Sequence, residues 1–165
     1  MKHIKLFENF SKKDPYIYDD KDFVDMIERT IEEDGSFVCT FVASAIKMLE
    51  GDNVKIYGFS TEENPDSAYF LATEGEDSAE GHHFAVLNDR YILDPWIYDN
   101  FYDYPKTFDR SVFDLQSKKD EDIIKFIYGD KNNWTDITKM IEEEYPFKKF
   151  FHKYKELLDY YNNLI

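Results

Sequence analysis

The sequence has little cysteine and few basic residues. Cys39 is the only cysteine in 165 residues, so the chain cannot form an internal disulfide framework or a zinc site built from several cysteines. Lys and Arg number 20 against 35 Asp and Glu, which gives a formal net charge of −15. Nucleic-acid binding requires cations that replace phosphate counterions, and anionic membranes repel acidic surfaces. We therefore expect neither nucleic acid nor a membrane as a partner.

The chain also lacks long hydrophobic runs. No apolar stretch approaches the roughly 18–20 residues of a membrane span. Residues 1–13 lack the apolar segment of a secretory signal. These absences predict an intracellular, cytoplasmic protein of a reducing compartment. The excess of carboxylates is compatible with a basic protein partner or with mimicry of nucleic acid, although solubility is the commoner reason for it. The oligomeric state is not indicated.

The pattern of apolar residues predicts an α+β fold. Residues 14–165 are long enough for a single domain, and residues 1–13 are expected to form a short N-terminal helix or a leader. Helical spacing and capping residues predict helices over 21–33, 37–49, 119–128, 134–144 and 147–164. Alternating or continuous apolar runs predict strands over 54–59, 68–72, 83–87 and 91–93. Helices therefore come first, a small antiparallel sheet lies in the middle, and helices return at the end.

The most informative stretch, GHHFAVLNDRYILDPW, is predicted to form a β-hairpin with its turn at the Asn-Asp pair. A two-residue loop places His83 directly opposite Asp94, with the Cβ atoms about 4.5–5.5 Å apart. This distance suits a carboxylate that orients an imidazole. Neighbouring strand residues point to opposite faces, so a loop longer by one residue would select His82 instead.

A thiol enzyme needs three groups that this chain supplies. Cys39 opens a predicted buried helix, where the free amides and the helix dipole favour a thiolate. We assign Cys39 as nucleophile, His83 as base and Asp94 as the group that orients the imidazole. His82 and Trp96 are candidates for the wall of a substrate cleft. In the alternative interpretations Cys39 is a small buried hydrophobe, Asp94 begins a turn and Trp96 packs in the core.

Three features together resemble the papain-like fold superfamily: a cysteine that opens a buried helix, His-Phe-Ala-Val at 83–86 and Tyr-Ile-Leu-Asp-Pro at 91–95. The resemblance covers roughly residues 35–98 and is greatest to the transglutaminase-like and papain-fold toxin or effector branches. It implies a Cys-bearing helix packed on a small antiparallel sheet. It also implies acyl transfer on a protein or peptide amide by a peptidase, a glutamine deamidase or a transglutaminase-like enzyme, with no cofactor and no metal. The chain departs from the pattern because no glutamine precedes Cys39 within residues 32–35, so a second oxyanion donor is unassigned.

The N-terminal sequence MKHIKLFENF resembles leaders of proteins encoded by large tailed phages. It implies a phage product that acts in the bacterial cytoplasm or is packaged in the virion. Two other functions stay open, an acidic interaction protein that inhibits a basic host factor or mimics nucleic acid, and a catalytically inactive papain-like binding domain. A metal site made of one histidine, Asp94 and Glu80 lacks the paired His or Cys spacing of zinc motifs.

Overall fold

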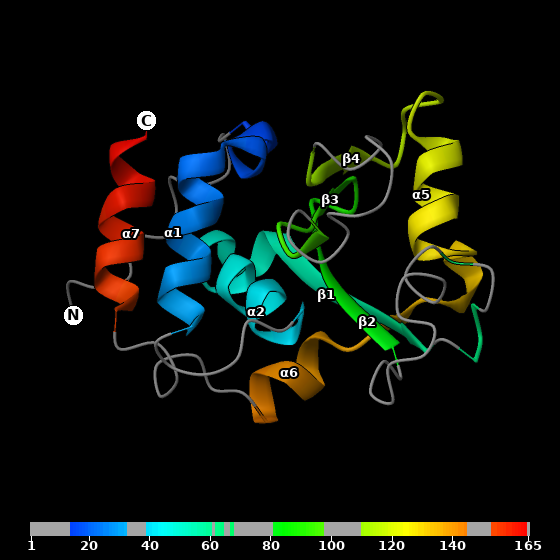
Figure 1. The fold of residues 1–165 in the computed structure, drawn as a ribbon. Coiled ribbons are helices and arrows are strands. Elements are labelled where there is room, and N and C mark those ends of the chain that lie inside the picture. Colours follow the sequence, from blue (N-terminus) through cyan, green and yellow to red (C-terminus); the bar gives the residue numbers. More distant parts are fainter. Residues whose placement is uncertain are drawn as a thin grey trace.

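The computed structural model describes residues 14–32, 39–60, 62–64, 67, 81–97, 110–144 and 153–164. Within these ranges lie five α-helices and five β-strands (Figure 1). The helices are α1 (Lys21–Glu32), α2 (Cys39–Glu50), α5 (Glu121–Tyr128), α6 (Thr138–Glu144) and α7 (Tyr154–Asn163). The strands are β1 (Val54–Ser60), β2 (Gly81–Leu87), β3 (Tyr91–Leu93), β4 (Val112–Asp114) and β5 (Thr135–Asp136). Short 3₁₀ helices occupy Pro15–Asp19, Gly51–Asn53 and Lys131–Asn133.

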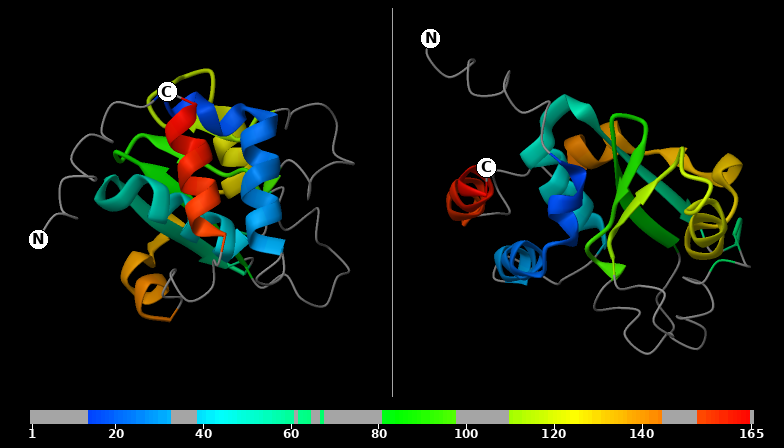
Figure 2. Two further views of the ribbon diagram at one scale, coloured as in Figure 1. Left: turned by 90° about the vertical axis from the view of Figure 1, so that its left-hand side faces the viewer. Right: turned by 90° about the horizontal axis from the view of Figure 1, so that it is seen from above.

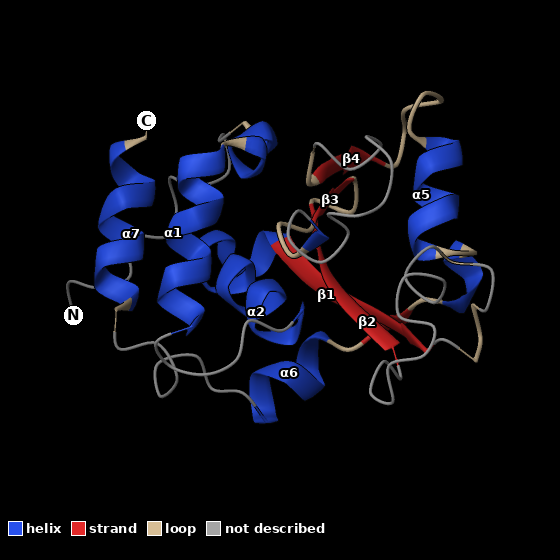
Figure 3. Ribbon diagram, viewed as in Figure 1, coloured by secondary structure: helices blue, strands red, loops and turns tan. Residues whose placement is uncertain are grey.

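The strands form one antiparallel sheet in the order β4-β3-β2-β1-β5, which makes the central layer of the molecule (Figure 3). Helices α1, α2 and α7 lie on one side of this sheet and α5 lies on the other (Figures 1 and 2). The prediction of an α+β fold with a small antiparallel sheet is confirmed. Helix α2, which begins at Cys39, packs directly against β1 and β2. This packing holds the helix close to the β2–β3 hairpin.

The helices form where apolar residues recur at helical spacing. In α1, Phe23, Ile27 and Ile31 are buried on one face. Helix α2 is buried along Val42–Glu50 because it lies between α1 and the sheet. It ends at Glu50, and the next residue, Gly51, has a φ of +63°, which glycine adopts more readily than other residues. None of the helices in the described ranges is both long and apolar enough to cross a membrane.

The predicted helix over 134–144 is wrong in its first part, and strand β4 was not predicted. The structure places β5 at the start of the expected helix, and α6 begins only at Thr138. Thr138 Oγ1 accepts a hydrogen bond from the N–H of Ile56 on β1 at 2.8 Å, and Asp136 Oδ1 accepts from the N–H of Thr138 at 3.0 Å. These bonds attach the segment to the sheet edge. The expected helix over 3–13, the expected strand over 68–72 and residues 147–152 of the last helix lie outside the described residues.

A buried carboxylate joins three elements at the end of α2. Glu50 is 4% exposed, and its Oε1 accepts a hydrogen bond from the hydroxyl of Tyr18 at 2.9 Å and another from the hydroxyl of Tyr161 on α7. A buried charged group is costly unless it is hydrogen-bonded. The two tyrosines therefore stabilise the carboxylate and hold the N-terminal 3₁₀ helix and α7 against α2.

Substituting Tyr161 by phenylalanine is expected to lower the free energy of unfolding by about 1.5–3 kcal/mol, because a hydrogen bond to a buried charged group is lost. Tyr160→Phe is the matched control, since Tyr160 neighbours it in α7 and stacks its ring on Phe23. Tyr160→Phe should lower the free energy of unfolding by less than about 0.5 kcal/mol. Urea denaturation measures both values, and equal losses in the two variants would show that the Glu50 contact is not the source of stability.

Candidate active site

The structure corrects the register of the hairpin. Leu87 faces Tyr91, so the loop between β2 and β3 contains three residues rather than the predicted two. This shift moves every later pair by one position, and the prediction that His83 lies opposite Asp94 is wrong. His82 is the histidine on the same face as Asp94, and its Nε2 lies 2.7 Å from Asp94 Oδ2. His83 points to the other face of the sheet, where its Nδ1 lies 2.7 Å from Thr40 Oγ1.

Arg90 explains why the loop has an extra residue. Its guanidinium binds the Asp114 carboxylate on β4 with two hydrogen bonds, Nε to Oδ1 at 3.0 Å and a terminal nitrogen to Oδ2 at 2.7 Å. Its backbone carbonyl accepts from the N–H of Leu115 at 2.8 Å. Arg90 is thus held by β4 and is left out of the β2–β3 pairing. The two loop residues before it, Asn88 and Asp89, both adopt a φ of 54°, as tight hairpin turns require.

Cys39 lies at an open edge of β2. Strand β3 pairs with residues 85–87 of β2, and among the residues that the structure describes no strand pairs with residues 81–84 on that edge. Backbone groups of alternate residues point to the same edge. At this edge the Leu87 carbonyl accepts from the N–H of Arg90 at 3.0 Å, and the His83 N–H points the same way. That amide donates to Cys39 at the start of α2. The thiol therefore lies between the two histidines, although they occupy opposite faces.

The His82–Asp94 pair is fully enclosed. His82 is 1% exposed and Asp94 is 2% exposed. Asp94 Oδ2 also accepts a hydrogen bond from the hydroxyl of Tyr128 at 3.0 Å, and Tyr128 is the last residue of α5. Four aromatic rings surround the imidazole, with centroids 5.0–6.1 Å from it: Phe59, Phe84, Trp96 and Tyr128. This aromatic cage encloses the imidazole and keeps it away from solvent.

The charges of the three groups support one another. Burial raises the pKa of the Cys39 thiol, but the hydrogen bond and charge of His82 and the His83 amide outweigh it and lower that pKa below its usual value. Burial also opposes a charge on His82, yet the Asp94 carboxylate and the Cys39 sulfur raise the pKa of His82 to about 10. Both shifts act in the direction of a thiolate next to an imidazolium.

His83 has the opposite character. Burial, together with the positive charge on His82, lowers the pKa of His83 to about 4. It is therefore neutral at physiological pH. Its ring covers Gly58 on β1, where an added Cβ would lie 2.7 Å from His83 Cδ2. Glycine at this position leaves the space that the ring occupies.

A cleft of about 430 Å³ opens beside Cys39. Its lining comes from the start of α2, the end of β1, the start of β2 and the β5–α6 segment: Cys39, Thr40, Gly58, Phe59, Ser60, Glu63, Gly81, His83, Thr135 and Ile137. His83 lines this cleft, whereas His82 and Trp96, predicted as cleft residues, are not among its described lining residues. They lie behind the thiol and pack against each other. The two histidines thus exchange the positions that the hairpin prediction gave them.

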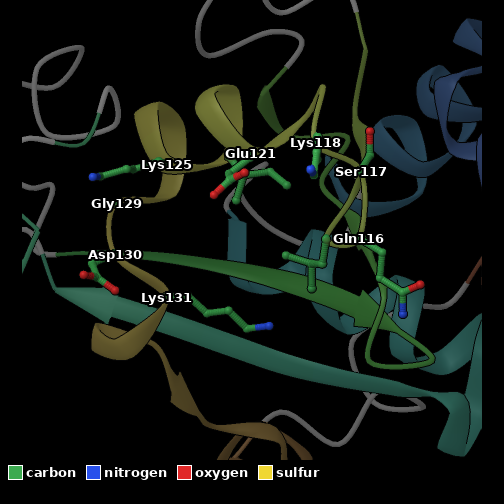
Figure 4. A pocket seen from close by; sticks show the side chains of 10 residues that line it. Gln116, Ser117, Lys118, Glu121, Lys125, Gly129, Asp130 and Lys131 are labelled. Atoms are coloured by element: carbon green, nitrogen blue, oxygen red, sulfur yellow. The ribbon is translucent and has the colours of Figure 1, made fainter.

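A second cavity of about 410 Å³ lies beside α5 (Figure 4). Lys118, Lys125 and Lys131 line it together with Glu121 and Asp130, so charges of both signs are mixed around it. Its described lining contains neither cysteine nor histidine. Of these two cavities, the Cys39 cleft is the one whose described lining contains a nucleophile with titratable partners. Among the described residues no group of three or more His, Cys, Asp and Glu side chains is arranged to hold a metal ion.

Comparison of the chain with protein-family models, curated proteins and solved structures finds no match. The interpretation of the site therefore depends on its own geometry. Two of its residues, Cys39 and Asp94, follow from sequence spacing. The sequence analysis missed Tyr128 and Thr40. The only sequence signal at Tyr128 is the apolar spacing of its helix, which does not indicate a contact with Asp94. Thr40 contacts His83 only because of the register of β2.

Proposed function

We propose that the chain is a cysteine-dependent acyl-transfer enzyme that acts on a protein or peptide amide, with Cys39 as nucleophile, His82 as general acid and base, and Asp94 as the orienting carboxylate. The observation that carries this proposal is the buried imidazole of His82, held by Asp94 at 2.7 Å and interacting with the Cys39 thiol. A thiol on the first turn of a helix, next to such an imidazole, is the arrangement that activates a nucleophile. The papain-like class implied by the sequence resemblance is part of the same proposal.

The proposed reaction begins with attack of the Cys39 thiolate on the carbonyl carbon. A C–S bond forms, and the π electrons of the carbonyl move to its oxygen. When this tetrahedral intermediate collapses, the C–N bond breaks and the His82 imidazolium gives its proton to the departing amine. Neutral His82 then takes a proton from water or from an amine as it attacks the thioester, and the thiolate is released. Water gives hydrolysis or deamidation, and an amine gives transamidation.

The two faces of the sheet have different roles in the proposed reaction. On the α5 side, Tyr128 and the aromatic cage hold Asp94 and His82 away from water, so the proton-transfer group keeps one orientation. On the α2 side, the cleft leaves Cys39 accessible to a substrate. The first-turn amides of α2 have no partner within the helix and lie next to the thiol, where an oxyanion would form.

Acylation of the thiol tests the proposal. With p-nitrophenyl acetate near pH 7, the native chain is expected to gain one acetyl group on Cys39 and to release further p-nitrophenolate as the thioester turns over. Intact-mass spectrometry and absorbance measure the two events. The same thiol in urea-unfolded protein should react at least about 100-fold more slowly near pH 6, since an ordinary thiol is less than about 1% ionised there.

Cys39→Ala is the matched control variant. It should remove both acetylation and turnover while changing the free energy of unfolding by only about 1 kcal/mol, because a small half-buried side chain is exchanged for another. Turnover that persists in Cys39→Ala, or a native thiol no faster than the unfolded one, would contradict the proposed function. An acidic interaction protein, the competing hypothesis from the sequence, predicts that second result.

A further inference from the structure

His83 belongs to the reactive cleft but has no place in the proton transfer described above. Its ring lies on the α2 face of the sheet, whereas His82 occupies the α5 face. It lines the same cleft as Cys39, and the two residues are linked because the His83 amide donates to the sulfur. A substrate carbonyl that reaches Cys39 through this cleft enters the cavity that the His83 ring lines.

The contact with Thr40 couples the tautomer of His83 to the orientation of the Thr40 hydroxyl. The ring is neutral, so one ring nitrogen donates a hydrogen bond and the other accepts one. The Thr40 hydroxyl lies 2.7 Å from Nδ1. When that hydroxyl donates to Nδ1, the ring proton resides on Nε2. This nitrogen lies against Gly58, 3.3 Å from the position of an added Cβ, and Gly58 is part of the cleft wall.

We propose that His83 is the second oxyanion donor of this site, and that its Nε2–H binds the carbonyl oxygen of the substrate together with a first-turn amide of α2. The inference rests on the proposed function, because an oxyanion forms only if Cys39 attacks a carbonyl. Donors aimed at the developing negative charge stabilise the transition state more than the ground state. In this arrangement Thr40 is a positioning residue that fixes the tautomer, and Gly58 provides the space for the ring.

Two reactions of the same sulfur separate this role from activation of the thiol. Acetylation by p-nitrophenyl acetate passes through a tetrahedral oxyanion. Alkylation by iodoacetamide forms the C–S bond as iodide leaves, and no oxyanion arises. A group that stabilises the oxyanion affects only the first reaction, whereas a group that activates the thiolate affects both. Both rates are measured on the native chain near pH 7.

His83→Phe keeps a ring of similar size and removes its N–H groups. It is expected to slow acetylation by about 100-fold and to change alkylation by less than about 3-fold, as expected for the loss of one oxyanion donor. His83→Gln keeps an N–H close to the position of Nε2 and should recover at least about 10-fold of the lost acetylation rate. Gly58→Ala, which forces the ring to move, should slow acetylation selectively without any change at residue 83.

The outcomes separate the two proposals. Equal losses of acetylation and alkylation in His83→Phe, or no loss of either, would overturn the role of His83. If the wild-type chain is still alkylated fast near pH 6, that result leaves the Cys39–His82 pair intact. Slow wild-type alkylation near pH 6 would overturn the proposed function and this inference with it. Selective loss in His83→Phe with recovery in His83→Gln would establish the donor.

Discussion

Replacing Asp94 by asparagine is expected to slow the alkylation of Cys39 near pH 6 by about 100-fold. Asp94 is the carboxylate that makes a buried imidazolium possible, since burial alone disfavours the charge on His82. With a neutral amide at this position, His82 loses its proton, and the thiol loses the positive charge and the hydrogen bond that lower its pKa. The asparagine oxygen can still accept from Tyr128, so the packing of α5 is retained.

Asp120→Asn is the matched control for this variant. Asp120 is also a buried aspartate that binds a cation, Arg110, but neither residue lines the Cys39 cleft. Far-UV circular dichroism should show that both variants are folded before rates are compared. We expect slow alkylation in Asp94→Asn and a rate within about 3-fold of wild type in Asp120→Asn. Equal effects in the two variants would mean that loss of a buried carboxylate acts through general destabilisation.

His82→Gln is expected to reduce alkylation near pH 6 by about 100-fold or more, while His83→Gln leaves it within about 3-fold of wild type. Without the imidazolium, the His83 amide remains to lower the pKa of Cys39, and burial raises it. We therefore expect little thiolate at this pH. The two histidines are adjacent in β2 and receive the same substitution. The comparison therefore tests the register of the hairpin as well as the identity of the base.

The reverse pattern would contradict the structure of the hairpin. If His83→Gln abolished fast alkylation and His82→Gln did not, the two-residue loop predicted from the sequence would hold in solution. A similar loss in both variants would indicate that the strand, and not a particular imidazole, maintains the thiolate. Iodoacetamide consumption followed by intact-mass spectrometry gives the rates, and a thermal melt of each variant excludes measurements on unfolded chain.

The positions of Cys39 and Asp94 in the fold could be predicted from the sequence, but the geometry between the strands could not. Cys39 at a helix start and Asp94 after a short strand follow from local signals that the structure bears out. The choice between the two histidines depends on a single residue in the loop. That residue, Arg90, is removed from the pairing by Asp114, which lies in β4, a strand that was not predicted from the sequence.

Contacts between distant segments were likewise beyond local reasoning. Tyr128 reaches Asp94 across 34 positions of sequence, and its helix was predicted without any indication of which face its last residue would take. The segment that begins at Thr135 had helical apolar spacing, but hydrogen bonds to β1 made its first residues a strand. In both cases tertiary contacts, which carry no local signature, decided the outcome.

The most direct test of the central claim is the pH dependence of Cys39 alkylation in the native wild-type chain. We predict a rate that stays near its maximum well below the pKa of about 8.5 of a free thiol, because His82 holds the sulfur as a thiolate. The rate should fall only when acid protonates that thiolate. A rate that rises with a single ordinary thiol titration near pH 8.5, and is negligible near pH 6, would contradict the activated Cys39–His82 pair.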